Sequence, residues 1–314
     1  MQNVSFHLIC ERDVGLFSLV QQVIANIPWA LCESRTPIVY FCNKTCYWTP
    51  HRYRGRSTVW EYYFQPLVAE YPASSISPQI RRVISENHPS PFEVGYFIDE
   101  RTFASTHFGD HPVLEEKALS IPYLLDDPDD DVRQKACSVI CRFVRPREYV
   151  QRKVDKFFRQ HMKGHYVIGL HVRGTDATSK KEIRPHRQGS LKLSRYAEEV
   201  ERLLGARPTA RIFVATDAWY SLEYLRKCFG NRVLATDSIR HEHGEAAGLG
   251  PTGWIMPAYI ASDRDRAARN GEEAVVEYLL LSRCDYLVHN GSSLARTVLL
   301  NVPQLSHTNT HCGV

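Results

Sequence analysis

Blocks of apolar residues separated by polar stretches predict an alternation of strands and helices. Near the start, residues 4–9 form a short apolar run that predicts a strand. A helical pattern beginning at Gly15 follows, and residues 37–41 predict a second strand. A strand, a helix and a strand in this order predict a parallel βαβ unit. Aromatic, serine and proline residues make the pattern irregular over residues 58–97, where we expect loops and short elements.

The second half of the chain is more regular. Pro146 is expected to start a helix with an apolar stripe at 3.6-residue spacing, which Gly164 ends. Strands and helices then alternate in the order strand 166–172, helix 193–204, strand 211–215, helix 221–229, strand 232–234, helix 272–282, strand 285–289 and helix 294–300. This order predicts an α/β fold whose second part is a doubly wound parallel sheet. We therefore divide the chain into domains at residues 1–146 and 147–314.

Composition narrows the class of protein. The chain has 314 residues, 43% hydrophobic and 24% charged, as expected of a globular protein with room for two domains. The net charge of +4 comes from scattered basic residues, whereas a nucleic-acid binder would show a dense basic stripe. No stretch approaches the ~20 apolar residues of a membrane helix or the pattern of a signal peptide. We expect a cytoplasmic protein, either free or peripheral to a membrane, and leave the oligomeric state open.

Cysteine and aspartate patterns bear on metal binding. The nine cysteines form no Cys-x-x-Cys pair, so we expect buried thiols in a reducing compartment rather than a zinc site. One large class of sugar transferases binds a divalent metal through Asp-x-Asp, and two such patterns occur. Residues 126–131 precede a predicted helix and are expected to cap it. Asp263 and Asp265 lie in a polar stretch that we expect to be a loop, so no metal is predicted.

Polar side chains follow three of the predicted strands. His171 and Arg173 lie on one face of the first, because alternate residues of a strand point the same way. An arginine offers a planar fork that matches two phosphate oxygens, although a salt bridge between Arg173 and Asp176 is the structural alternative.

The other two strand ends carry hydroxyl, amide and carboxylate groups. Thr216 and Asp217 end the second strand, and Ser292 and Ser293 precede the last helix. A helix N-terminus favours an anion such as phosphate, although plain helix capping is the alternative at both places. Because ligands bind beyond the carboxyl ends of parallel strands, the three ends together predict a pocket for a charged nucleotide.

These motifs resemble a known family. The segments 171–176, 215–217 and 277–288, followed by Ser292 and Ser293, resemble in order and spacing the α1,6-fucosyltransferase superfamily. That superfamily includes the core fucosyltransferases of animals and the rhizobial nodulation fucosyltransferase. The resemblance covers roughly residues 166–303, and the first half shows only a compatible pattern.

The resemblance implies both a fold and an activity. The fold would be GT-B-like, with two Rossmann-type domains facing a cleft: an acceptor-side domain over 1–146 and a nucleotide-sugar-binding domain over 147–314. The activity would be an inverting, metal-independent transfer of fucose from GDP-fucose to a glycan hydroxyl, without a cofactor. Another nucleotide-sugar donor, or a catalytically silent nucleotide- or glycan-binding protein on the same scaffold, stays open. A nicotinamide enzyme ranks last, because Gly248–Gly253 lacks the strand and helix that its glycine motif requires.

The resemblance also implies residue roles. Arg173 would contact the donor's β-phosphate and stabilise the leaving group, while His171 and Glu277 would recognise the guanosine. The compared family member has aspartate at the position of Glu277, so a different base is open. The phosphates would be held by Ser292 and Ser293, and the cleft would be lined by Thr216 and Asp217.

The catalytic base is a further implied role. The family's base is a glutamate some ten residues after the histidine, which Glu182 fits after a shift of one residue. Asp176 is the second candidate. The polar stretch 240–269 is expected to cover the cleft or meet the acceptor, and the acceptor and linkage are open.

Overall fold

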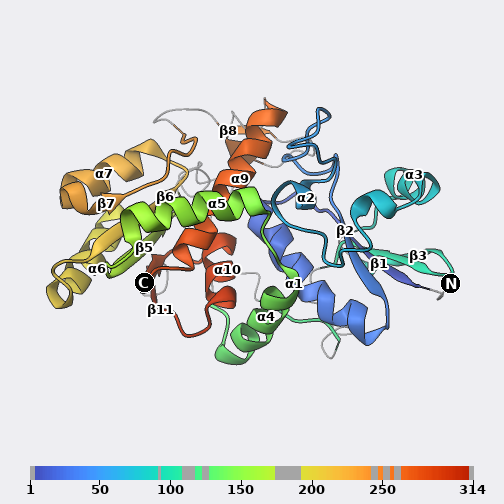
Figure 1. Cartoon of the computed structure of the whole chain (residues 1–314), viewed down its shortest axis with the longest axis horizontal. Helices are drawn as coiled ribbons and strands as arrows, with labels where there is room; N and C mark the ends of the chain where they lie inside the picture. The colour runs from blue at the N-terminus through green and yellow to red at the C-terminus, as the bar shows by residue number, and fades with distance from the viewer. Residues whose placement is uncertain are drawn as a thin grey trace.

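The computed structural model describes residues 4–90, 93–107, 117–121, 127–173, 192–241, 247–249, 255–257 and 263–310. Two β-sheets lie side by side, each with helices packed on it. In Figure 1 the first half of the chain lies on the right and much of the second half on the left. Three helices lie between the sheets: α1 (Leu16–Cys32), α9 (Arg264–Leu281) and α10 (Ser293–Asn301).

The first sheet has four strands in the order β2-β1-β4-β3. The parallel strands are β1 (Phe6–Cys10), β2 (Thr36–Tyr40) and β4 (Thr102–Ser105), and β3 (Tyr96–Asp99) runs antiparallel to β4. The predicted βαβ unit is confirmed as β1, α1 and β2. The irregular stretch holds the short helices α2 (Val59–Tyr63), η1 (Ala73–Ser75) and α3 (Pro78–Glu86), as its broken pattern predicts.

The second sheet has five parallel strands in the order β11-β10-β5-β6-β7. The strands are β5 (Val167–Val172), β6 (Arg211–Thr216), β7 (Val233–Leu234), β10 (Tyr286–His289) and β11 (Ser306–Asn309). The helices after β5 and β6 are α6 (Leu193–Ala206) and α7 (Trp219–Phe229), with η5 (Gly230–Arg232) before β7. The predicted alternation is confirmed. The polar sequence of β11 gave no strand signal, and β8 (Ala247–Leu249) and β9 (Ile255–Pro257) form a separate hairpin.

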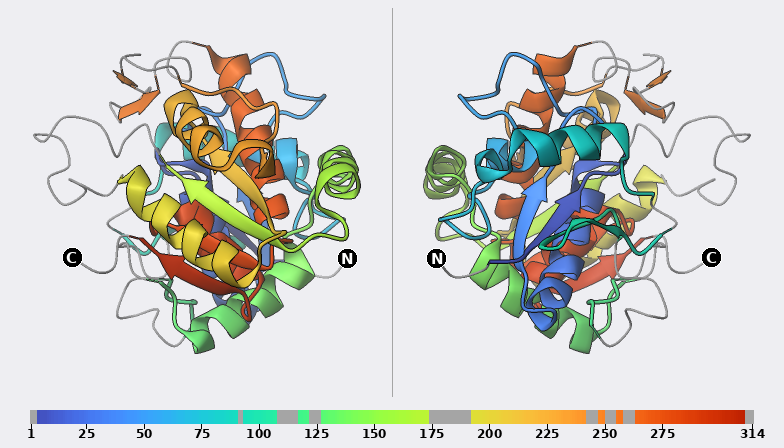
Figure 2. Two further views of the ribbon diagram at one scale, coloured as in Figure 1. Left: turned by 90° about the vertical axis from the view of Figure 1, so that its left-hand side faces the viewer. Right: turned by 90° about the vertical axis from the view of Figure 1, so that its right-hand side faces the viewer.

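The two faces of the second sheet pack against different partners. Ile168, Leu170 and Val172 of β5 pack with α6 and α7, which lie in front of the sheet in the left view of Figure 2. Val167 belongs to a core that includes α1, α9 and α10. Since side chains alternate along a strand, His171 lies on this second face, toward the first half of the chain.

Two helices bridge the halves. Asp129 caps α4 (Asp130–Phe143), with its Oδ1 accepting from the N–H of Val132 at 2.8 Å, so the capping prediction for the acidic cluster is confirmed. The helix predicted after Pro146 is α5 (Glu148–Phe157), which continues into the π-helical η3 (Phe158–Met162). Helix α4 of the first half packs on α10 of the second, and α5, which follows the boundary between the halves, packs on α9.

The start of α9 corrects the prediction for residues 263–271. Asp263 is the N-cap, and its Oδ1 accepts from the N–H groups of Asp265 and Arg266 at 3.0 Å each. This second Asp-x-Asp pattern therefore begins a helix and is not a loop. Charged residues and Gly271 concealed the helical pattern, and the glycine is required because a Cβ there would collide with the Tyr63 hydroxyl.

Cysteine exposure differs from the prediction. The eight cysteines in the described part of the chain are free, and Cys32, Cys141 and Cys228 are exposed, so the expectation of buried thiols is wrong for these three. None of the described helices combines the length and apolar character needed to cross a membrane.

Candidate functional site

Three strands of the second sheet end at one edge. The register pairs Val172 of β5 with Thr216 of β6, so Arg173 and Asp217 follow in neighbouring positions. On the other side, β10 runs parallel to β5, and α10 begins after it at Ser293. The predicted convergence of three strand ends is therefore present in the fold.

His171 and Ser292 come into direct contact. The Ser292 hydroxyl lies 3.2 Å from Nδ1 of His171, although 121 positions separate the two residues. Both side chains are buried, and Ser292 also caps α10 by accepting from the N–H of Ala295 at 3.2 Å. The Tyr196 hydroxyl donates to the His171 carbonyl at 3.2 Å and fixes the strand end from the α6 side. This contact places the start of α10 beside His171, which precedes Arg173 by two positions in the sequence.

Ser293 lies in the contact between α10 and α1. Its hydroxyl is 2.9 Å from that of Ser18, and its carbonyl accepts from the Gln21 side-chain amide at 2.9 Å. Arg296 also donates to the Ser293 hydroxyl at 3.3 Å. These contacts tie the two halves together, and a role for Ser293 in phosphate binding stays a prediction.

Thr216 and Asp217 shape the turn after β6. Thr216 is buried, and its hydroxyl accepts from the N–H of Ala218 at 3.3 Å, a contact of the capping type. The Asp217 carbonyl accepts from the N–H of His241 at 2.7 Å, which holds the segment after β7 against this turn. Their predicted role in lining the cleft is untested.

A tyrosine of the first half reaches this edge. Burial raises the pKa of Tyr47 well above its usual range, while the charge of Arg173 opposes the rise and that of Asp217 adds to it. The Tyr47 hydroxyl accepts from the N–H of Leu16 at 3.4 Å, in the first turn of α1. Tyr47 therefore lies within electrostatic reach of both strand ends. An isolated tyrosine in an irregular stretch carries no sequence signal that could have identified it.

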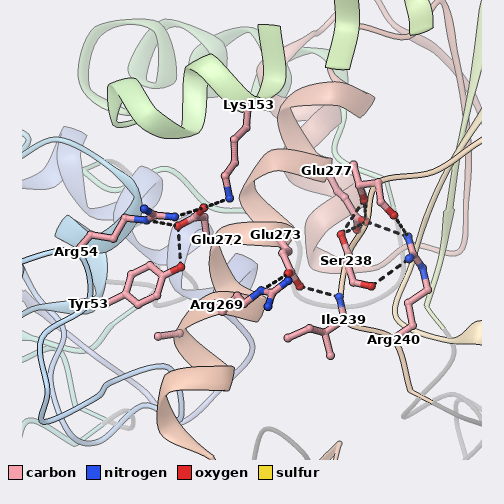
Figure 3. A network of polar contacts seen from close by, with 12 residues as sticks. Tyr53, Arg54, Lys153, Ser238, Ile239, Arg240, Arg269, Glu272, Glu273 and Glu277 are labelled. Atoms are coloured by element: carbon pink, nitrogen blue, oxygen red, sulfur yellow. Dashed lines mark hydrogen bonds and ion pairs between the residues drawn. The ribbon is translucent and has the colours of Figure 1, made fainter. Parts of the chain in front are cut away.

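Glu277 of α9 is buried in a polar contact set near the end of β7. Its Oε1 accepts from the hydroxyls of Thr236 at 2.6 Å and Ser238 at 3.0 Å, and an Arg240 nitrogen lies 3.7 Å away (Figure 3). Burial raises the pKa of Glu277 to about 7, against the opposing effects of Arg240 and the two hydroxyls. A carboxyl group in this state changes its charge near neutral pH.

Arg240 was missed as a site residue, because it lay in the stretch expected to be a cleft cover. Its guanidinium donates to the carbonyls of Ser238 at 3.1 Å and Thr236 at 2.9 Å, and it is almost fully buried. The same group lies over the ring of Trp219, 5.3 Å from the centroid. Trp219 begins α7 and is 37% exposed, so it offers an aromatic surface beside this contact set.

Helix α9 supplies two further buried glutamates, shown together in Figure 3. Glu272 accepts from the Tyr53 hydroxyl at 2.7 Å and Arg54 Nε at 2.8 Å, and it also pairs with Lys153. Glu273 accepts from the N–H of Ile239 at 2.9 Å, directly before Arg240. Through these two glutamates, α9 forms hydrogen bonds with the first half of the chain, with α5 and with the segment after β7.

Asp127, His289 and His307 form a cluster of potential metal ligands. The Gly291 N–H donates to His289 Nδ1 at 3.0 Å, so in the neutral ring Nε2 carries the proton, 3.6 Å from Asp127. Burial lowers the pKa of His289 to about 4, and Asp127 opposes the shift. A metal-bound histidine normally donates its other ring N–H, so this hydrogen bonding suits support of the turn before α10 better than metal binding.

The predicted bases Asp176 and Glu182 lie outside the described residues. The assignment of either as the catalytic base therefore stays a prediction.

Comparisons with known proteins agree with this architecture. A family model described as nodulation protein Z (NodZ) matches residues 129–307. Nodulation protein Z of Bradyrhizobium diazoefficiens is 28% identical over 158 residues, which are 49% of this chain and 39% of that protein. The matched stretch therefore spans well under half of that relative's length.

Two solved structures extend the likeness to the first half. One is NodZ α-1,6-fucosyltransferase soaked with GDP-fucose, with a TM-score of 0.56 and 16% identity over 96% of this chain and 93% of that one. Another is POFUT1 in complex with GDP, with a TM-score of 0.55 and 12% identity over 98% of each chain. At these identities the likeness shows a shared GT-B-like fold across nearly the whole chain.

Proposed function

The chain belongs to the nodulation protein Z family, and on this premise we propose that it transfers fucose from GDP-fucose to a glycan hydroxyl. The observation that carries the proposal is the contact between His171 and Ser292 beside Arg173. It puts a guanidinium fork and a helix N-terminus at the same edge of a parallel sheet. Both favour phosphate oxygens, and a nucleoside diphosphate supplies them in pairs.

The base would bind near Glu277. The edge of guanine carries two neighbouring N–H donors, which suit a carboxylate acceptor. Thr236 and Ser238 both donate to Oε1, so the base would approach the other carboxylate oxygen. Trp219 and Arg240 flank this position with an aromatic ring and a buried positive charge. The same arrangement disfavours uracil and adenine, which lack guanine's paired donors.

The reaction would proceed with inversion and without a metal. A glycan hydroxyl attacks the anomeric carbon from the face opposite the diphosphate. The bond from that carbon to the phosphate oxygen breaks, and the negative charge passes to GDP. Arg173 and the start of α10 stabilise that charge by preorganised hydrogen bonding. The proton of the attacking hydroxyl passes to a carboxylate, for which Glu182 is the first candidate and Asp176 the second.

A donor panel tests the proposal. GDP-fucose, GDP-mannose, UDP-galactose and ADP-glucose are each incubated with the protein and EDTA, and nucleotide release is measured with and without oligosaccharides. We expect release from GDP-fucose that rises when an acceptor is present. Release from a uridine or adenosine donor only, or only after metal addition, contradicts the proposal. GDP binding without any release supports the silent binding protein instead.

A further inference from the structure

A cavity of about 280 Å³ lies in the first half of the chain, at the carboxyl ends of β1 and β2. None of the described donor-site residues lines it. Its walls come from the two strand ends, the segment that follows β2 and helix α3. The lining residues that bear on its chemistry are Glu11, Tyr40, Lys44, Trp48, Arg81 and His88.

Glu11 brings a buried carboxylate to this cavity. It follows β1 directly and is 2% exposed. Its Oε1 accepts from the Lys44 backbone N–H at 3.2 Å. Its Oε2 is buried and has no hydrogen-bond partner within the described part of the chain. A buried carboxylate oxygen in this state is costly in free energy, so a ligand that donates to it would be bound favourably.

His88 faces Glu11 across the cavity wall. Nδ1 lies 3.1 Å from the Pro89 carbonyl, which only accepts, so Nδ1 carries a proton. The other nitrogen, Nε2, is 3.9 Å from Glu11 Oε2, too far for a direct hydrogen bond. Nε2 also has no hydrogen-bond partner among the described residues. In the neutral ring it is an acceptor, so the cavity presents two neighbouring acceptors, which suit the two O–H donors of a vicinal diol.

The remaining wall fits the apolar face of a sugar ring. The indole N–H of Trp48 donates to the Ser57 carbonyl at 3.1 Å, which fixes the orientation of the ring. Aromatic rings provide apolar contact area with few rotatable bonds, and the C–H face of a pyranose packs on such a surface. An aromatic ring beside two hydrogen-bond acceptors is a combination suited to a neutral carbohydrate.

The polar groups of the cavity are not arranged for the phosphates of a second nucleotide. Arg81 donates through Nε to the Ile76 carbonyl at 2.8 Å and through Nη2 to the Ser74 carbonyl at 2.7 Å. Two nitrogens of the Arg81 guanidinium therefore already donate to backbone carbonyls, so this side of the group is not arranged to bind a phosphate. The Glu11 carboxylate would repel a diphosphate at the short distances of this cavity.

Two consecutive residues connect the cavity with the contact between the halves. Trp48 lines the cavity, and the Tyr47 hydroxyl accepts from the N–H of Leu16 at 3.4 Å, at the start of α1, which packs on α10. A sugar bound at Trp48 would therefore sit next to the region where the two halves meet.

We propose that this cavity binds a sugar residue of the acceptor glycan, with Glu11 and His88 accepting hydrogen bonds from neighbouring ring hydroxyls and Trp48 packing on the ring. This inference rests on the proposed function, because it assigns the second substrate of the same reaction.

Ligand-observed NMR tests the assignment with the methyl glycosides of glucose, galactose, mannose and N-acetylglucosamine. At least one should bind the wild-type protein, and Glu11→Gln should weaken that binding about tenfold, because it removes a hydrogen bond to a charged group. The matched control is Glu70→Gln, an exposed glutamate of the same half, which should bind as the wild type does. Failure of all four glycosides to bind the wild type, or equal binding by Glu11→Gln, overturns the assignment.

A second variant covers the case in which Glu11→Gln does not fold. His88→Gln changes the opposite wall and should also weaken glycoside binding, while unchanged binding overturns the assignment. GDP titration of the same proteins separates this inference from the proposed function. Glycoside binding that depends on Glu11, without GDP binding, would contradict the proposed function and leave the cavity assignment standing. GDP binding without glycoside binding would contradict the cavity assignment and leave the proposed function standing.

Discussion

The carboxyl edges of the two sheets carry different sets of polar side chains. The edge of the second sheet carries Arg173, followed across the sheet by the start of α10 at Ser292. The edge of the first sheet carries the buried carboxylate of Glu11 beside Trp48. Both edges follow the same βαβ construction, so the backbone alone does not distinguish them. Under the proposed assignments, the difference teaches that one architecture can serve an anionic donor and a neutral acceptor, because the residues at the strand ends set the ligand.

Removing the Arg173 guanidinium should have the largest effect. Arg173→Ala is expected to slow GDP release from GDP-fucose by about 10²–10³, the usual cost of losing one preorganised donor to a developing negative charge. Arg173→Lys should be intermediate, because it keeps the charge but loses the planar fork. Initial rates at saturating donor measure the effect. The control is Arg226→Ala, an exposed arginine of α7. Equal rates in Arg173→Ala and the control contradict the role of this edge.

Breaking the link between the halves should cost stability. Glu272→Ala removes hydrogen bonds from Tyr53 and Arg54, and we expect the free energy of unfolding to fall by about 2 kcal/mol. The exposed pair of Glu148 and Arg152 serves as the control, since Glu148→Ala should cost well under 1 kcal/mol. Urea unfolding of both variants gives the comparison.

The same link has a defined pH dependence. Burial is the largest single effect on the pKa of Glu272, and by itself it would raise this pKa. The hydrogen bonds from Arg54, Lys153 and Tyr53 together outweigh burial, so the pKa lies below its usual 4.5. Its stabilising contribution is therefore present above that pH and lost as the pH falls through the folded-state pKa. A stability loss in Glu272→Ala that is as large at acid pH as at neutral pH contradicts this account.

GDP affinity should rise with pH if Glu277 accepts from the base. With its pKa at about 7, Glu277 is mostly protonated at pH 6 and mostly ionised at pH 8. The affinity should therefore increase about tenfold over that range, and Glu277→Gln should remove the increase. Stability changes in the opposite direction. A raised carboxyl pKa stabilises the folded state at low pH, and this contribution is lost as the pH rises from 4.5 to about 7. A pH-independent wild-type affinity contradicts base recognition by Glu277.

The adjacent serines should give the smallest effects and separate two roles. Ser292→Ala removes the cap of α10 and the contact with His171, and should cost about 1 kcal/mol of stability and weaken GDP binding. Ser293→Ala removes the contact with Ser18 and leaves the cap in place. Thermal unfolding and GDP titration of both variants make the comparison. A larger loss of GDP affinity in Ser293→Ala would move the phosphate contact to that residue.

The sequence predicts the alternation of elements better than their contacts. The βαβ unit and the second sheet follow from apolar runs, but β11 (Ser306–Asn309) is polar and has no such run. The start of α9 was missed, because a glycine within a sequence does not favour a helix. Gly271 is needed there to leave room for Tyr63, which comes from a distant part of the chain. The strand-end motifs predicted that His171 and the start of α10 lie at one edge of the sheet, but not the direct contact between His171 and Ser292. The pairing of Glu277 with Arg240 and the approach of Tyr47 depend on tertiary packing, which local patterns do not encode.

Calorimetric titration of GDP in EDTA against the wild type, Arg173→Ala and Glu11→Gln tests the central comparison most directly. The account predicts that Arg173→Ala loses most of the GDP affinity, while Glu11→Gln keeps it. Loss of GDP binding in Glu11→Gln with retention in Arg173→Ala would place the nucleotide at the first sheet and contradict the account.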